Sequence, residues 1–575
     1  MKKMLFCMVF TATAMFSLGA VNDQRIIDLD SPVYRNLAAL YLLQGKALPS
    51  TSLPYSDDEA RLALASLDEG ALASDAEREL YRAIEADLSP LRSSAGQLDY
   101  RIAGDLTLEG YLHTNPASFN SERDWSRGYG KRSALGTLTF ETWPLSSFYS
   151  YFALPVMNNF GVVSSSSTIP NELPNTLYGR EVFTTNIIML SPNKIETIDL
   201  NFPYRAFVSI GGPHWNLQIG REWISWGAGK SGNFMVSDNL PYQQMGRFTT
   251  YFDTFKYTLL ASFFTHPKIN DYPLPNAGAN QQDLLADGIK LFLAHRVEVK
   301  LLQQRLSLAV GESMMYQSAT GSIDLRFLNP VGFYHNQYIR GNSNSMLSVE
   351  ADYTIGRGIN IYGQVGIDEI TFGEEVAPAS HAKPDAFAYL AGIQTALPLG
   401  PGILTLGLEG AYTDPFLYLR EKYNTTTEQF GVGYDVIVRV LSHSMENLRY
   451  WQGYPWGGDA ITATVSAGWE LAHKLNIQGS LLLLVHGVLT FDSQWKLYSG
   501  SEAVATTPTR ENPFDLSEHG AVSYTVLATV KGEYQISRNL GAMAHLALPM
   551  VWNKGNESAA MVADLQTSLA LRYTF

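Results

Sequence analysis

The sequence LQTSLALRYTF, from Leu565 to Phe575, ends the chain and decides the fold. From Leu569 to Phe575 every second residue is apolar or aromatic, which is the period of a β-strand with one apolar face. A soluble sheet rarely ends on such a strand, because an exposed apolar edge promotes aggregation. A closed barrel has no edge, since its last strand pairs with its first. The stretch therefore predicts the closing strand of a transmembrane barrel, and the last strand of a soluble sandwich is the alternative.

The composition also favours a membrane barrel. Charged residues make up 17% of the chain, against about 25% in typical soluble domains. Aromatic residues make up 12%, and most of them are Tyr and Phe. Few charges and many aromatics fit strands that expose apolar side chains to lipid at alternate positions. The formal net charge of −14 argues against nucleic acid as a partner, because phosphates attract basic surfaces.

The first twenty residues have the pattern of a secretory signal. Lys2 and Lys3 form a basic start, and the apolar run from Leu5 to Phe16 is too short to span a bilayer as a helix. We expect residues 1–20 to be removed. Cys7 is the single cysteine and would leave with this segment, so the mature chain would form no disulfide.

Residues 21–97 read as a small helical segment. Ser31 followed by Pro32 marks a helix start, and capping boxes begin at Ser56 and at Ser74. Three short amphipathic helices are expected, and we place this bundle in the periplasm against the barrel mouth. It either plugs or braces the barrel, or it contacts export or assembly machinery in the periplasm.

Residues 98–575 read as an all-β outer-membrane barrel. Apolar and polar residues alternate through most of this region, and its length allows roughly 16 to 18 antiparallel strands, with an even count expected. Long polar inserts interrupt the alternation, as the outward-facing loops of barrels do. They lie at 158–185, 266–284, 371–384, 414–432 and 500–520.

Charged residues on these strands are expected to line the lumen, because Arg or Lys on the lipid face costs about 2–4 kcal/mol at the midplane. They form either a ladder of ion pairs that fills a closed barrel or the lining of a path for sugars or ions. His295 falls on the opposite face, so we expect it near a rim or beside a bulge. The six lumen-lining candidates are Arg296, Glu298, Lys300, Glu350, Asp352 and Asp368.

No motif predicts catalysis. The run Gly227–Asn233 contains Gly-Ala-Gly-Lys-Ser, but its glycines are too close together for a phosphate loop. We expect this run to fold tightly inward, with Trp226 packed beside the wall. The histidines lack a plausible nucleophile, and none lies at short spacing from another histidine as metal ligands do. The sequence therefore predicts a protein without catalytic residues, metal or cofactor.

Four aromatic residues near loop ends are candidates for ligand contact. Such residues often form the girdle at the membrane interface, and the alternative is that their flat faces stack on sugar rings. The candidates for a sugar-binding surface are Phe416, Tyr418, Tyr454 and Trp456.

An ordered set of motifs resembles the Wzi family, outer-membrane proteins of capsule assembly. The set spans nearly the whole mature chain, but the segments 158–185, 371–384 and 500–520 match less well. Its members are Ser31–Tyr34, Gly220–Asn233, Ala294–Glu298, Leu325–Pro330, Phe333–His335, Tyr412–Pro415 and Gly453–Ala460.

The resemblance implies an 18-stranded barrel with a periplasmic helical bundle, which contacts outer-membrane lipid and tethers surface polysaccharide as a non-catalytic lectin. Two alternatives from other classes remain. A porin-like diffusion channel would need a sparsely filled lumen, and a surface adhesin would depend on the outer loops.

Overall fold

The computed structural model describes most of the chain after residue 23. The described residues are 24–88, 99–119, 124, 126–127, 131–145, 147–156, 182–187, 204–265, 288–318, 321–323, 326, 329–336, 343–370, 385–419, 432–439, 447–491 and 521–575. The expected signal, and the expected inserts 266–284, 371–384 and 500–520, lie outside these ranges, as do most of 158–185 and 414–432.

Three α-helices form near the start, each at the capping residue that the sequence indicates. The side chains of Ser31, Ser56 and Ser74 each accept a hydrogen bond from a backbone N–H of the first turn. The predicted helical segment is therefore confirmed as a set of helices. Of the helices in the described ranges, none is both long and apolar enough to cross a bilayer. The bounds are α2 (Pro32–Leu43), α3 (Asp57–Ala65), the 3₁₀ turn η1 (Glu69–Ala71) and α4 (Asp75–Asp87).

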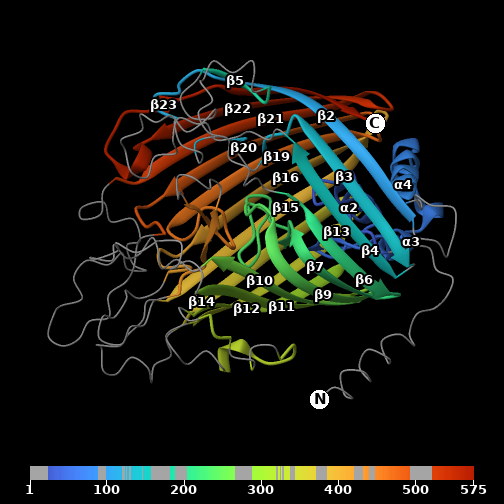
Figure 1. Cartoon of the computed structure of the whole chain (residues 1–575), viewed down its shortest axis with the longest axis horizontal. Coiled ribbons are helices and arrows are strands. Elements are labelled where there is room, and N and C mark those ends of the chain that lie inside the picture. Colours follow the sequence, from blue (N-terminus) through green and yellow to red (C-terminus); the bar gives the residue numbers. More distant parts are fainter. Residues whose placement is uncertain are drawn as a thin grey trace.

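The rest of the described chain is dominated by one closed antiparallel barrel of 18 strands (Figure 1), which confirms the predicted fold class. Short strands β5 (Phe183–Thr185) and β23 (Val562–Ala563) add to it. The barrel strands are β2 (Asp99–His113), β3 (Gly136–Leu145), β4 (Phe148–Val156), β6 (Ala206–Gly212), β7 (Trp215–Glu222), β9 (Gln243–Phe252), β10 (Phe255–Thr265), β11 (Ile289–Leu301), β12 (Leu306–Ser318), β13 (Ser343–Gly356), β14 (Ile359–Glu369), β15 (Ala386–Leu399), β16 (Gly402–Thr413), β19 (Ala460–Leu471), β20 (Leu475–His486), β21 (Ser523–Ser537), β22 (Leu540–Trp552) and β24 (Gln566–Thr574).

The last strand closes the barrel, as its sequence indicates. β24 pairs with β2 from Asp105↔Thr574 to His113↔Gln566. Beyond the last pair, Gly104 and Phe575 exchange backbone hydrogen bonds of 3.1 and 2.9 Å. A Cβ atom on Gly104 would lie 2.4 Å from the Phe575 ring, so a larger residue would require that ring to move. The closed sheet rules out the two stacked sheets of a sandwich.

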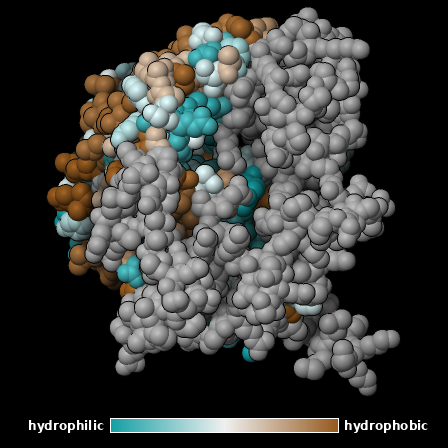
Figure 2. Space-filling model, turned by 90° about the vertical axis from the view of Figure 1, so that its left-hand side faces the viewer, coloured by the Kyte–Doolittle hydropathy of each residue, from teal (hydrophilic) through white to brown (hydrophobic). Residues whose placement is uncertain are grey.

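The outer face of the barrel is apolar and the inner face is polar. On β13 and β14, Val349 and Ile361 are each 41% exposed, whereas Asp352 and Asn360 on the opposite face are buried. Figure 2 shows the hydrophobic residues gathered on the outside of the wall. Such an exterior suits hydrocarbon rather than water.

One part of the outer wall is covered by protein. The described part of the connection from β12 to β13, with its 3₁₀ turn η6 (Tyr334–Asn336), lies outside the barrel (Figure 1). Tyr334 packs there on residues of β11 and β12. His295 lies beneath this connection, with its Nε2 3.3 Å from Glu312 and its ring against Tyr334. The expectation for His295 is wrong, because it sits at mid-strand in an unbroken register, neither at a rim nor at a bulge.

Part of the lumen is filled by the chain itself. Two connections fold inward, the segment 223–242 with β8 (Ser225–Trp226) and the described parts of 414–459 with β17 (Asp435–Arg439) and β18 (Asn447–Trp451). Their apolar residues form one buried cluster with side chains of the inner wall, and Trp226 belongs to it. We call these two connections the plug.

Candidate functional site

The start of the chain enters the barrel and meets the plug. Residues 46–59, here called the strap, run along the inner wall, and β1 (Ser52–Leu53) pairs with β8 of the plug. The backbone N–H of Gly227 also donates to the carbonyl of Thr51 at 2.9 Å. The strap therefore joins the helices to the inward-folded connections.

Charged side chains of the barrel wall hold the strap through its polar groups. Glu298 accepts hydrogen bonds from Ser50 Oγ (3.0 Å) and from the backbone N–H of Thr51 (3.3 Å). Arg296 donates to Thr51 Oγ1 at 2.6 Å and to Glu350 at 2.9 Å. Asp352 accepts from the backbone N–H of Leu48 at 2.8 Å.

A buried ion pair links the end of the strap to the wall. Lys256 Nζ lies 2.5 Å from Glu59 Oε1 and also donates to the Ser52 carbonyl at 2.6 Å. Burial raises the pKa of Glu59, and the charge of Lys256 opposes that rise. The carboxylate and the ammonium are both buried and both hydrogen-bonded, which is the condition for a charge pair to persist away from water.

The structure places all six predicted lumen charges on the inner face. Arg296 and Glu350 form a cross-strand ion pair at 2.9 Å, as a ladder predicts, and the other four contact the strap, α2 or the plug. Arg296, Glu298, Glu350 and Asp352 form the network that holds the strap. The ammonium of Lys300 lies 4.7 Å from the centre of the Tyr41 ring of α2. Asp368 accepts from the backbone N–H of Tyr418 in the plug at 2.7 Å. The alternation in the sequence predicts which face of the strand each charge occupies. It does not predict which segment of the chain each charge contacts.

The Gly-Ala-Gly-Lys-Ser run holds a carboxylate of the protein itself. Glu409 on β16 accepts from the backbone N–H groups of Lys230 and Ser231, each at 2.7 Å, and from Ser231 Oγ at 2.5 Å. Tyr362 donates to the same carboxylate at 2.8 Å. Successive N–H groups in a tight turn form an anion-binding concavity, and here the anion is Glu409. The inward fold expected for this run is present.

Another buried charge was missed by the sequence analysis. Arg205 makes two hydrogen bonds to Glu222, at 2.8 and 2.9 Å, and a longer one to Asp28 at 3.2 Å. This group ties residues 24–30 to the inner wall. The only sequence signal is that Glu222 continues the alternation of β7, which predicts an inward carboxylate but no partner.

The four aromatic candidates lie at the plug rather than at the membrane interface. Tyr418 and Tyr454 have 0% exposure and Phe416 has 5%, and Trp456 packs against the same cluster. Tyr418 donates to the Phe234 carbonyl, and Tyr454 Oη lies 2.7 Å from Thr462 Oγ1. Burial raises the pKa of Tyr454 to about 12. In this arrangement the rings of Tyr418 and Tyr454 have no free face for a sugar.

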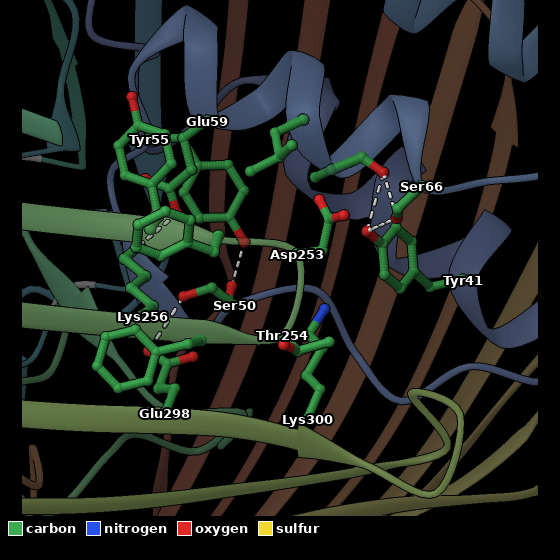
Figure 3. Close-up of a pocket in the computed structure, with 15 residues that line it drawn as sticks. Tyr41, Ser50, Tyr55, Glu59, Ser66, Asp253, Thr254, Lys256, Glu298 and Lys300 are labelled. Carbon is green, nitrogen blue, oxygen red and sulfur yellow. Dashed lines mark hydrogen bonds and ion pairs between the residues drawn. The ribbon is translucent and has the colours of Figure 1, made fainter. Parts of the chain in front are cut away.

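A small cavity that opens to solvent lies between the helices and the β9–β10 turn. Figure 3 shows the Lys300 ammonium on the side of the cavity that holds Asp253. Burial raises the pKa of Tyr41 in its wall to about 12. Tyr55, Lys256 and Glu298 also line it. Across the described residues, no group of three His, Cys, Asp or Glu side chains is arranged to hold a metal ion.

Comparisons with known proteins identify the fold. No protein-family model and no curated protein matches the sequence. Among solved structures, Wzi of Escherichia coli, an outer-membrane protein involved in group 1 capsule assembly and a carbohydrate-binding β-barrel, is similar over 96% of this chain and 99% of its own. The identity is 13% and the TM-score 0.54. OccD3 (OpdP) of Pseudomonas aeruginosa matches with a TM-score of 0.39 at 10% identity, over 84% of this chain and 93% of its own. The chain has the fold of an outer-membrane β-barrel.

Proposed function

We propose that this protein tethers polysaccharide at the outer membrane, as a binding protein that performs no catalysis. The observation that carries the proposal is the filled lumen. A barrel of 16 to 18 strands leaves an aqueous channel when its interior is open, and here the strap and the plug occupy much of it with a buried aromatic cluster. Such filling suits a rigid binding platform better than a wide diffusion channel.

The likeness to Wzi of Escherichia coli supports the same proposal. It extends over the barrel and the N-terminal helices together, since it covers 96% of the chain. We carry over from that protein its carbohydrate binding and its part in capsule assembly.

The proposal places the helices in the periplasm, where they are accessible to export or assembly machinery. They pack on the end of the barrel with the short turns, where Gly358 N donates to the Leu42 carbonyl at 2.6 Å. Arg357, in the same turn, lies 2.8 Å from Glu77 of α4. Short turns face the periplasm in bacterial barrels.

Deletion of the gene tests the proposal. We expect less polysaccharide on the cells and more in the medium, with unchanged total synthesis, because the protein acts on retention. Expression of the wild-type protein in the deletion strain should restore cell-bound polysaccharide. Equal retention with and without the protein would exclude the proposed function.

A further inference from the structure

The inner wall is unevenly covered. On β9 to β14, inward polar side chains such as Arg247, Thr258 and Asn360 are buried, with 1% exposure or less. On β21, Lys531 and Glu533 also face inward, because Val530 and Tyr534, which flank them on the strand, are exposed on the outer face. Yet the side chains of Lys531 and Glu533 are 35% and 41% exposed.

Neighbouring inward positions share this exposure. Gln478 on β20 pairs in register with Lys531 and is exposed. His545 on β22 pairs with Lys531 from the other side and is half-buried, as are Ser480 and Thr529. Partly exposed polar side chains on the inner face of a closed barrel require a water-filled space beside them. The plug is therefore eccentric and leaves a polar chamber along β20 to β22.

The opposite side of the chamber is formed by the N-terminal segment and the plug. Partial desolvation and the charge of Asp28 raise the pKa of the Asp30 carboxyl, just before α2, and the charges of Lys531, Glu533 and Asp238 also act on it, so the wall and the plug come near this carboxyl. Asp30 and Asp238 are both exposed. Figure 2, which faces the end of the barrel with the long connections, shows hydrophilic residues gathered around a recess.

Aromatic residues border the chamber next to Asp238. The indole N–H of Trp223 donates to the Asp238 carbonyl at 2.7 Å. The Trp223 ring meets Tyr242 edge to face, with ring centroids 6.4 Å apart. Both rings are half-buried, unlike the rings of Tyr418 and Tyr454.

We infer that this chamber binds a segment of a hydroxyl-rich glycan. The inference rests on the proposed function and assigns it a site. Its wall offers amide, hydroxyl, ammonium and carboxylate groups that exchange hydrogen bonds with sugar hydroxyls, and its aromatic edge offers apolar ring surface. A few polar groups beside aromatic surface are the usual composition of a small-molecule site. Charges of both signs give the site no preference for a strongly charged polymer.

Thiol labelling tests whether the chamber is open. Thr529→Cys places a thiol on the inner face, and the adjacent Ala528→Cys places one on the outer face of the same strand. Both variants carry Cys7→Ala, which removes the natural cysteine. In purified protein in detergent, we expect N-ethylmaleimide to modify Thr529→Cys, and the carbohydrate extracted from the surface of the parent cells to slow this reaction. Modification of Ala528→Cys should not respond to that carbohydrate. An inner-face thiol that does not react, or that reacts equally with and without carbohydrate, would overturn the inference.

Binding measurements with the same surface extract test the residues. We expect Trp223→Ala and Lys531→Ala each to weaken retention of the extract on immobilised protein by about tenfold, because each removes a large contact surface or a charged donor. Arg305→Ala, in the short turn between β11 and β12 and therefore away from β20 to β22, is the control and should bind as wild type.

The result separates the two proposals. If deletion of the gene releases polysaccharide while both chamber variants bind as wild type, the tethering function stands and the chamber site is wrong. If deletion changes nothing and the extract binds neither variant nor wild type, both are wrong.

Discussion

At the scale of single residues, the most informative one is Glu409, which converts a phosphate-loop-like run into a structural clamp. A Gly-rich turn that ends in Lys-Ser presents backbone N–H groups to an anion whatever the source of that anion. In an isolated loop the anion would be a ligand. Here β16 supplies a carboxylate from the wall, so the N–H groups of the turn are already occupied, and this contact anchors the plug.

Replacing Glu409 should loosen the plug. Glu409→Ala leaves the donors of Lys230, Ser231 and Tyr362 without their acceptor, and we expect a loss of about 3 kcal/mol in the free energy of unfolding. Urea unfolding of the protein in lipid vesicles measures it. Glu409→Gln keeps one carbonyl acceptor and should lose less. Equal stability of Glu409→Ala and wild type would show that the contacts of Glu409 do not contribute to the free energy of unfolding.

The ion pair at Asp435 predicts a pH dependence. Burial alone would raise the pKa of Asp435, but Lys290 and Arg449 outweigh it and lower this pKa below the ordinary 3.8. A carboxyl group with a lowered pKa in the folded state stabilises that state above its unfolded pKa and loses this contribution as the pH falls. Stability from Asp435 is therefore complete near neutral pH and fades below about pH 4.

The comparison of wild type with Asp435→Asn measures this contribution. We expect the variant to be less stable by about 3 kcal/mol at pH 7, since Lys290 and Arg449 keep their charges after the partner is removed. The gap between the two unfolding free energies should shrink as the pH falls below 4. A gap that stays constant with pH would contradict the assigned ion pair.

At the scale of elements, the strap is a feature that the alternation of apolar and polar residues does not predict. Its polar backbone groups need partners inside the barrel, and the wall supplies Glu298, Asp352 and Lys256 at the required places. The sequence predicts the inward face of these charges, because ionised groups avoid lipid. It does not predict the strap, because residues 46–59 lack a periodic pattern and their partners lie some 200 to 300 residues away in the chain.

The orientation of the helices is open to a direct test. Arg82 on α4 is 64% exposed, and Ser558 is exposed in the connection between β22 and β24 at the other end of the barrel. With Cys7 replaced, Arg82→Cys should react with a membrane-impermeant maleimide only after the outer membrane is permeabilised. Ser558→Cys, the matched control, should react in intact cells. The reverse pattern would place the helices outside the cell.

At the scale of the whole molecule, the sequence predicts the wall better than its contents. The terminal strand, the alternation and the capping serines give the closed barrel and the three helices, because these depend on local periodicity. The plug is decided by contacts distant in sequence. Tyr418 and Tyr454 show the limit, since an aromatic residue near a loop end looks the same whether it faces lipid, sugar or a buried cluster.

The filled interior also predicts the electrical behaviour of the molecule. In planar bilayers we expect the wild-type protein to show little steady conductance, because the strap and the plug leave only the eccentric chamber. Replacing residues 223–242 with a short Gly-Ser turn removes β8, and with it the pairing partner of β1 and six of the buried apolar residues of the cluster.

This variant should conduct more than wild type, since it removes one of the segments that fill the lumen and an empty barrel of this strand number encloses an aqueous channel. The matched control deletes residues 321–336, whose described members lie over the outer wall, and should conduct as little as wild type because the lumen is untouched. A large steady conductance of the wild-type protein would favour the diffusion channel. It would mean that the strap and the plug do not remain inside the barrel in the membrane. The protein would then lack the filled, rigid interior that supports polysaccharide tethering.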